Sequence, residues 1–497
     1  MHAESVYLFR HALMRDAAYQ LQMPAERSRL HALALDVLSE LAGADAGFAT
    51  ASAFEIAEHA KAAQVAAAEP ALFESLCAQE ARWREKAARD AEGNLLQCLK
   101  YWQSLAAMPH ARQALRAEAL IFWARGQRLT GQPIAAGESL REAARLIEEN
   151  SIDAHRRLLF LEQSELCSHM GKRRDARQLL HAAMDHARAS KDAKAISLSA
   201  LALAGHYLAE NRFPECESLL AQAEASCAAI GFIPGQASCV GLRANMAYRR
   251  DNAQEAILGW QRCAALAAQS GQAHQVIVAR GNIGSGLMKL GRFKEAAANY
   301  RQAIAQAESS GERMLETTNT INLGLSLFFC AEHGEARRCF EKGIALSRET
   351  ASAPTLCNAL TNLGKVQTAG GHHAEALVSF SEGALLASRI GLALDEAECR
   401  TGEGAMLFLL GSADAAIPKL RQAVALLDTC AGPADACHVI APAWLAIALL
   451  KSGAAEPARS VASRAMAELA RPEMESHPWD KTALGLFSQL RDLLGRR

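Results

Sequence analysis

Apolar residues along this chain recur at the 3.6-residue spacing of α-helices, and short turn sequences interrupt the pattern. Between Val278 and Glu308 it predicts two helices that meet at Gly291. The first helix carries Ile283 and Leu287 on one side. The second carries a longer apolar stripe, made of Phe293, Ala296, Ala297, Tyr300, Ala303, Ile304 and Ala307. Neither helix can bury its stripe alone, so the pair needs neighbours of the same kind.

The same two-helix pattern returns every forty residues on both sides of Gly291. Small residues stand seven before, five after and twelve after each turn position, and a large residue stands nine after it, from Leu140 to Leu420. All turn residues but one are Gly, Asn or Asp, types that tolerate a left-handed backbone. The turn positions are Gly131, Gly171, Asn211, Asp251, Gly291, Ala331, Gly371 and Gly411. The sequence therefore predicts an all-α fold of stacked helical hairpins.

This grid of small, large and turn positions resembles the tetratricopeptide repeat (TPR). The usual TPR period is 34 residues, whereas the period here is forty. HEAT repeats share the forty-residue period, but the small-residue grid fits TPR better. The resemblance implies a right-handed TPR-like α-solenoid of about ten helical hairpins. It divides the chain into a winged-helix-like or linker remnant at 1–50, degenerate helical repeats at 51–112, a TPR solenoid at 113–474 and a capping helix at 475–497.

The first fifty residues carry a second resemblance. They are similar to a signature of STAND-type signalling ATPases, in which a winged-helix-like region joins a nucleotide-binding module to a TPR sensor. The matching residues are Phe9, Arg10, His11, Ala12, Leu13, Arg15, Asp16, Ala17, Ala18, Tyr19, Arg27, Leu30 and His31. However, no P-loop pattern G-x-x-x-x-G-K-[ST] occurs in the sequence. We therefore expect no nucleotide hydrolysis, and the chain resembles the sensor half of a larger protein.

Both ends of the sequence predict an amphipathic helix. Pro24 begins one, with Leu30, Leu33, Val37, Leu38 and Leu41 on its apolar side. The other runs from Trp479 to Leu494, and its apolar side carries Leu484, Phe487, Leu490 and Leu494. Charges on the opposite side of this last helix are typical of a solvent-facing cap.

Composition narrows the possible partners. The chain has 497 residues and a formal net charge of −1, so no field of one sign attracts nucleic acid or an anionic membrane. Without a signal peptide or an apolar run long enough to span a bilayer, it is expected to be cytoplasmic. Its thirteen cysteines form no C-x-x-C pair, so we expect free thiols rather than a metal site. Neither a catalytic constellation nor a cofactor motif, such as a dinucleotide-binding loop, is found.

Asparagines mark the face that the first helices of the hairpins would share. In a TPR, the residue nine positions before the turn points into the concave groove, and here it is Asn282, Asn322 and Asn362 in three consecutive repeats. An Asn side chain offers one acceptor and two donors to a peptide backbone. The alternative is that each asparagine bridges to the next helix. Asn358, Lys365 and Asn245 are expected on or near the same surface.

Two functions remain from the sequence. The first is a non-enzymatic interaction module, whose concave face binds a peptide or protein partner in signal transduction or regulation. The alternative is the sensor part of a larger STAND-type regulator, whose ATPase and nucleotide-cyclase or DNA-binding output lie upstream or on another chain. The sequence predicts neither the identity of the partner nor the oligomeric state.

Overall fold

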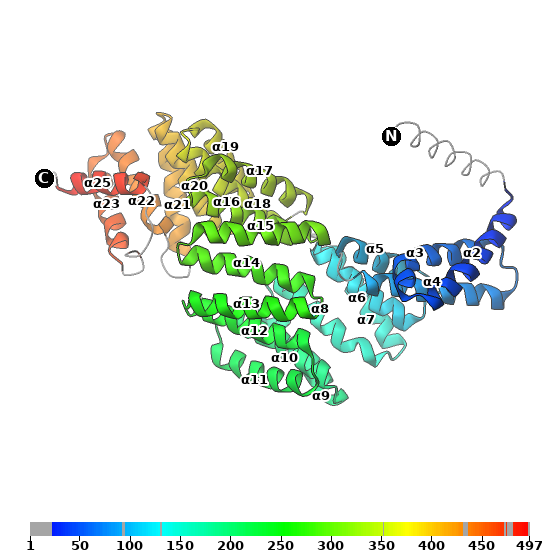
Figure 1. Ribbon diagram of the computed structural model, residues 1–497. Coiled ribbons are helices and arrows are strands. Elements are labelled where there is room, and N and C mark those ends of the chain that lie inside the picture. The colour runs from blue at the N-terminus through cyan, green and yellow to red at the C-terminus, as the bar shows by residue number, and fades with distance from the viewer. Residues whose placement is uncertain are drawn as a thin grey trace. The chain divides into compact units, whose positions relative to one another are not determined.

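The computed structural model describes residues 22–91, 95–129, 132–350, 352–430, 436–471, 474 and 481–495. Throughout these residues the regular structure is helical, which confirms the predicted all-α fold (Figure 1). The chain divides into two compact units. The first comprises Met1–Arg250, Arg262–Val276 and Ser309–Glu312; the second comprises Asp251–Gln261, Ile277–Glu308 and Arg313–Arg497.

In the first unit, consecutive helices pair as hairpins. Among these pairs are α6 with α7, α8 with α9 and α10 with α11. Two short 3-10 helices, at Gln64–Ala66 and Asp153–His155, interrupt the series. The α-helices are α2 (Pro24–Ala44), α3 (Ala46–Ala63), α4 (Pro70–Asp90), α5 (Leu95–Ala106), α6 (Gln113–Leu129), α7 (Pro133–Glu149), α8 (Arg156–His169), α9 (Arg173–Ser190), α10 (Ala193–Ala209), α11 (Phe213–Ala229) and α12 (Ile233–Arg249).

The division between the units falls within the helices α13 (Ala253–Gln269), α14 (Ala273–Lys289) and α15 (Phe293–Ser310). In the second unit, first helices contact the first helices of the next hairpins, α16 with α18, α18 with α20 and α20 with α22. The remaining helices of this unit are α16 (Arg313–Phe329), α17 (His333–Glu349), α18 (Ala353–Ala369), α19 (His373–Ile390), α20 (Ala393–Leu409), α21 (Ala413–Thr429), α22 (Ala436–Lys451), α23 (Ala455–Leu469) and α25 (Lys481–Gly495).

The grid of small and large residues explains how each hairpin packs. Tyr300 on α15 lies against Gly284 on α14, so closely that a Cβ at Gly284 would come within 2.6 Å of the Tyr300 ring. The same pairing recurs forty residues apart, between Gly324 and Phe340, Gly364 and Phe380, and Gly404 and Leu420. One partner must be small because the other fills the space between the two helices.

The turn positions adopt the predicted left-handed backbone. Gly291 has a φ of 72°, and even Ala331 has a φ of 61°, although its Cβ makes that conformation costly. Asn211 and Asp251 are left-handed as well. Seven of the eight turn positions confirm the forty-residue register, and the eighth, Gly131, lies outside the described residues.

The helix that begins at Pro24 exists, but its apolar side was assigned wrongly. Leu35 and Ala42 are the buried apolar residues of α2, because they face the alanine-rich helix α3. Of the predicted side, only Leu38 packs against the apolar cluster that contains Leu35 and Ala42, whereas Leu30, Leu33, Val37 and Leu41 are exposed. Periodicity reveals an apolar stripe, but not which stripe meets a neighbour. The STAND-like segment from Phe9 to Tyr19 lies outside the described residues.

The last helix differs from its prediction in the same way. In α25, Phe487 and Leu490 are buried as expected, whereas Leu484 and Leu494 are exposed. The buried side also includes Leu486 and Leu493, which join Phe487 and Leu490 in one apolar cluster with residues of α22 and α23. The predicted start of this helix at Trp479 lies outside the described residues.

Candidate functional site

The three predicted asparagines lie at equivalent positions of α14, α16 and α18 in the second unit. Because α16 contacts α18 directly, the first helices form a layer, and residues forty positions apart occur at the same place on neighbouring helices. Asn282 and Asn322 are half-buried. Within the part of the chain that the structure describes, the side chain of Asn322 makes no hydrogen bond. Its amide is therefore available to a bound molecule.

Asn362 is different, because only 7% of it is exposed. Its Nδ2 donates to the backbone oxygen of Asn358 at 2.9 Å and to Oδ1 of Asn358 at 3.1 Å. Asn358 itself is exposed. Asn362 thus orients Asn358, and the two predicted residues form one polar pair on α18.

Asn319, which was not among the predicted asparagines, packs between two first helices. It is buried on α16, and its Oδ1 lies 2.6 Å from the position that a Cβ of Gly281 on α14 would take. Its Nδ2 donates to the carbonyl of Leu315 at 2.7 Å. The residue type did not distinguish Asn319 from Asn322, three positions later. The available signal was Gly281, because a glycine in the middle of α14 leaves room for a side chain of a neighbouring helix.

Lys365 does not present a free positive charge. Its Nζ lies 2.5 Å from Oε1 of Glu398 on α20, and the pair links two neighbouring first helices. Partial burial lowers the pKa of Lys365, but the Glu398 carboxylate raises it more, so its pKa lies above the usual value. Burial and the charge of Glu398 also raise the pKa of Asp395. Because Lys365 is paired with Glu398, it adds no net positive charge to this end of the face.

Asn245 lies on α12 in the first unit and is half-buried. The other five predicted residues belong to the second unit. The structure therefore brings together Asn358 with Asn362, places Asn282 and Asn322 at matching positions, and groups these with Lys365 in one unit.

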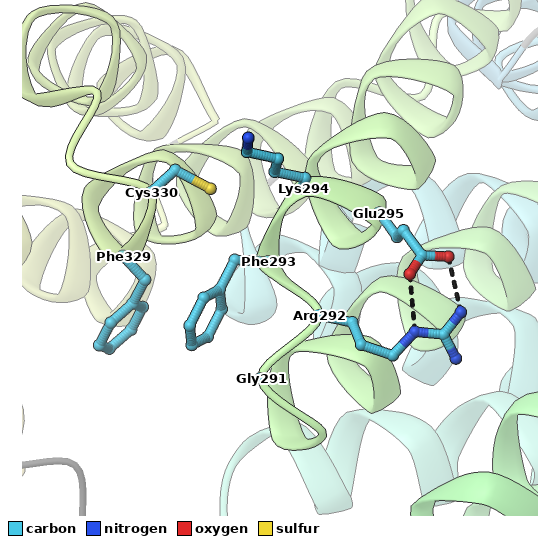
Figure 2. Close-up of a pocket in the computed structure, with 7 residues that line it drawn as sticks. All are labelled: Gly291, Arg292, Phe293, Lys294, Glu295, Phe329 and Cys330. Atoms are coloured by element: carbon cyan, nitrogen blue, oxygen red, sulfur yellow. Dashed lines mark hydrogen bonds and ion pairs between the residues drawn. The ribbon is translucent and has the colours of Figure 1, made fainter.

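A pocket that sequence reasoning missed lies at the turn between α14 and α15 (Figure 2). Its volume is about 340 Å³. The rings of Phe293 and Phe329 stack side by side in it, with centroids 4.8 Å apart and planes 15° apart. We call it the turn pocket; its lining residues are Gly291, Arg292, Phe293, Lys294, Glu295, Phe329 and Cys330.

Two aromatic residues close to successive turn positions could have indicated the turn pocket in the sequence, but the helical period assigned one of them to a buried stripe. Phe293 was assigned to the apolar stripe of the second helix, although it stands only two residues after Gly291. Phe329 stands two residues before the next turn position, Ala331. Aromatic residues that flank successive turns lie at the ends of helices rather than between them, and this position would have indicated a surface pocket.

The remaining chemistry-bearing residues have structural surroundings. All thirteen cysteines are free thiols, and burial raises the pKa of Cys239 to about 12. The glycine-rich sequence at 281–286 lies inside α14, where Gly284 and Gly286 pack under Tyr300 and Ile257. Among the described residues, no three His, Cys, Asp or Glu side chains are placed to hold a metal ion. Nor does any described helix have the length and apolar character needed to cross a membrane.

Comparison with known proteins supports the repeat assignment. Residues 278–309 match the tetratricopeptide repeat family. A search of curated proteins finds no match. Among solved structures, the chain is similar to a Signal Transduction ATPase with Numerous Domains (STAND) protein with a tetratricopeptide repeat sensor from Pyrococcus horikoshii. The TM-score is 0.50 at 15% identity, over 79% of this chain and 56% of that one.

Two further structures have lower TM-scores. One is a Rap protein in complex with Competence and Sporulation Factor, with a TM-score of 0.47 at 15% identity over 71% of this chain and 98% of that chain. The other is Aspartyl phosphate phosphatase F from Bacillus subtilis, with a TM-score of 0.43 at 13% identity over 74% and 98%.

The repeat grid, the left-handed turns and the family match at 278–309 agree with one another. The chain spans little more than half the length of the archaeal STAND protein, and at this identity the likeness concerns the fold alone. The chain therefore has a tetratricopeptide-repeat-like fold of helical hairpins, and its residues 278–309 match the tetratricopeptide repeat family.

Proposed function

We propose that this chain is a non-enzymatic interaction module that binds an extended peptide or protein segment in signal transduction or regulation. The binding face is formed by α14, α16 and α18 and carries Asn282, Asn322 and Asn358. The observation that supports it most is Asn322, whose half-buried amide makes no hydrogen bond within the described part of the chain. A polar group in such surroundings gains from a partner that supplies a donor or an acceptor.

The neighbouring side chains favour a site that hydrogen-bonds to the backbone of a bound peptide over one that binds a charged group. Nδ2 of Asn362 donates to Oδ1 of Asn358 at 3.1 Å, so the Asn358 amide is oriented before a partner arrives. This reduces the entropy lost on binding. Lys365 is neutralised by Glu398 at 2.5 Å, so this face cannot clamp a carboxylate. We therefore propose that the asparagines of this face pair with peptide groups of the bound segment.

A second function is supported by the similarity to the archaeal STAND protein. The chain matches 56% of that protein, which leaves room for further modules elsewhere. In this case the chain is the sensor part of a larger regulator, whose ATPase and output domains are encoded upstream or on another chain. Reading the genomic sequence upstream of Met1 separates the two functions, because an in-frame P-loop there would establish the second.

The binding face is tested with a triple variant. Peptides selected from a random displayed library on the wild-type chain are measured against Asn282→Ala, Asn322→Ala and Asn358→Ala combined. We expect the affinity to fall by at least about tenfold, while circular dichroism shows an unchanged helix content. Asn299→Ala is the matched control, because Asn299 lies on the second helix α15 and already donates to the Glu295 backbone. Undiminished binding by a folded triple variant would refute the proposed face.

The non-enzymatic part of the proposal has its own test. The purified chain should show no ATP turnover, because its sequence has no P-loop. Hydrolysis that co-purifies with the chain through several unrelated columns would contradict the proposal.

A further inference from the structure

We infer that the turn pocket is a second docking site, separate from the asparagine face, which takes a peptide segment with a large apolar side chain next to a carboxylate. The pocket belongs wholly to the second unit. Its two parts are the stacked pair Phe293 and Phe329 and, on the opposite side from their rings and near Cys330, Lys294 at the start of α15 (Figure 2).

The apolar part of the pocket is open to a partner. Phe329 is 42% exposed, and Leu290, immediately before Gly291, is exposed to a similar degree. A Cβ added at Gly291 would meet nothing within 4 Å, so the turn does not close the pocket. A volume of about 340 Å³ lies at the lower end of the range for ligand sites. It suits one large apolar side chain rather than an extended cofactor.

At the equivalent turn in the first unit, a side chain covers the aromatic ring that follows the turn. Phe213 stands two residues after the turn residue Asn211, just as Phe293 follows Gly291. There the guanidinium of Arg250 lies over the Phe213 ring, 4.9 Å from its centroid. In the turn pocket, Phe293 instead meets a second aromatic ring, which extends the apolar surface rather than covering it.

The charges at the pocket favour an acidic neighbour for the apolar side chain. Arg292 donates to both carboxylate oxygens of Glu295, at 2.7 and 2.6 Å. This bidentate pair raises the pKa of Arg292, lowers that of Glu295 and cancels both charges. Lys294 is exposed and makes no ion pair within the described part of the chain. The pocket therefore retains one uncompensated positive charge.

The start of α15 adds to this positive charge. The first-turn N–H groups of a helix have no acceptor within the helix, and the helix dipole is positive at this end. The preceding residue is Arg292, and its guanidinium carries only hydrogen-bond donors, so it cannot cap those N–H groups. A carboxylate placed beside Lys294 would pair with its ammonium group and accept hydrogen bonds from the first-turn N–H groups. A single lysine is too little charge for a nucleic acid backbone, so a peptide is the fitting partner.

The test uses acetylated, fluorophore-labelled decapeptides of glycine and serine that carry a central Phe-Glu pair. Fluorescence polarisation with the full chain should show saturable binding, and the comparison peptides Phe-Lys and Ala-Glu should bind at least about tenfold more weakly. Binding of the Phe-Glu peptide should weaken as the salt concentration rises. Absence of saturable binding, or equal binding of the Phe-Glu and Ala-Glu peptides, would overturn the inference.

Two variants separate the apolar from the charged part of the site. Phe329→Ser should weaken binding of the Phe-Glu peptide at least about tenfold, and Lys294→Glu should reverse the preference toward the Phe-Lys peptide. Lys451→Glu is the matched control, because Lys451 is also exposed on the second unit. Equal losses from Lys294→Glu and Lys451→Glu would contradict a specific site. The triple asparagine variant should bind these peptides normally, which distinguishes this site from the asparagine face.

Cys330 provides a readout that does not depend on affinity. It lines the pocket, and a bound peptide should slow its alkylation by iodoacetamide, followed by mass spectrometry. Cys430 is similarly half-buried and does not line the pocket, so its alkylation should not change. Equal protection of both thiols, or of neither at a saturating peptide concentration, would count against docking at this turn.

Discussion

Tyr300 shows how a single position determines the packing of a hairpin. It is 1% exposed, and its ring occupies the space that the missing side chain of Gly284 leaves. Its hydroxyl lies 3.1 Å from that of Ser285, which satisfies a polar group near the interior. The side chain therefore contributes packing and one hydrogen bond, and two substitutions can measure them separately.

Tyr300→Ala should cost about 3–5 kcal/mol of local stability, as loss of a buried aromatic side chain does. Tyr300→Phe keeps the ring and should cost only about 0.5–1.5 kcal/mol, the usual net value of one hydrogen bond. Hydrogen exchange of α14 and α15 measures both changes, since long repeat arrays need not unfold in a single step. If the two variants proved equally stable, Tyr300 would not be part of the core.

Ala331→Gly should stabilise the chain by about 1 kcal/mol. Ala331 has a φ of 61°, where a Cβ is strained and glycine is not. Gly334→Ala is a useful comparison, because Gly334 lies in the first turn of α17 with open space around its Cβ position and should also gain stability on substitution. A lower denaturation midpoint for Ala331→Gly would show that the strain is absorbed elsewhere.

At the scale of helices, the sequence could predict the repeat but not every contact. The forty-residue grid follows from packing within a hairpin, and each buried position recurs, so the positions of Gly284 and Tyr300 were predictable. The buried side of α2 was not, because α2 has two apolar sides and only the partner helix decides between them. The role of Asn362 was not predictable either, since it depends on the hydrogen bond to Asn358. Buried positions recur in every repeat, whereas polar surface contacts differ from one repeat to the next.

The pairing of α2 with α3 predicts a pH dependence. Nδ1 of His31 lies 2.7 Å from Nδ1 of His59, and burial, then His59 and Arg27, lower the pKa of His31 from its usual 6.5. The unfolded chain then binds more protons than the folded one just below pH 6.5. This contribution to stability is complete above pH 6.5 and is lost as the pH falls below it.

Urea unfolding between pH 7.5 and 5 can measure this contribution, with hydrogen exchange reporting on α2 and α3. His31→Gln should unfold with a shallower pH dependence than the wild type, because it removes the shifted group. Burial also lowers the pKa of His206, so part of the slope should remain in the variant. Identical slopes for the two proteins would mean that His31 keeps its ordinary pKa.

Across the whole molecule, each hairpin contacts its neighbours, so damage should remain local. Leu490→Ala on α25 should cost about 2–5 kcal/mol, because Leu490 is fully buried against α22 and α23. Leu484→Ala, on the exposed side of the same helix, should change stability by less than about 0.5 kcal/mol.

Hydrogen exchange after Leu490→Ala should rise in α22 and α23 and remain unchanged in α16 and α17. Faster exchange throughout the second unit would show that the unit unfolds cooperatively instead. Either result shows how far a local change in stability spreads in this unit. It therefore bears on whether binding at the turn pocket could alter binding at the asparagine face.

The direct contact between successive first helices also has a consequence for the conformation of a partner. Helices in contact lie about 8–10 Å apart, and a polyproline II chain advances about 9 Å in each three-residue turn. Such a chain would return the same side of its backbone to every helix of the layer. A β-strand, whose side chains alternate every two residues, would fall out of step. The layer of α14, α16 and α18 is thus expected to read a left-handed, threefold ligand, one turn for each repeat.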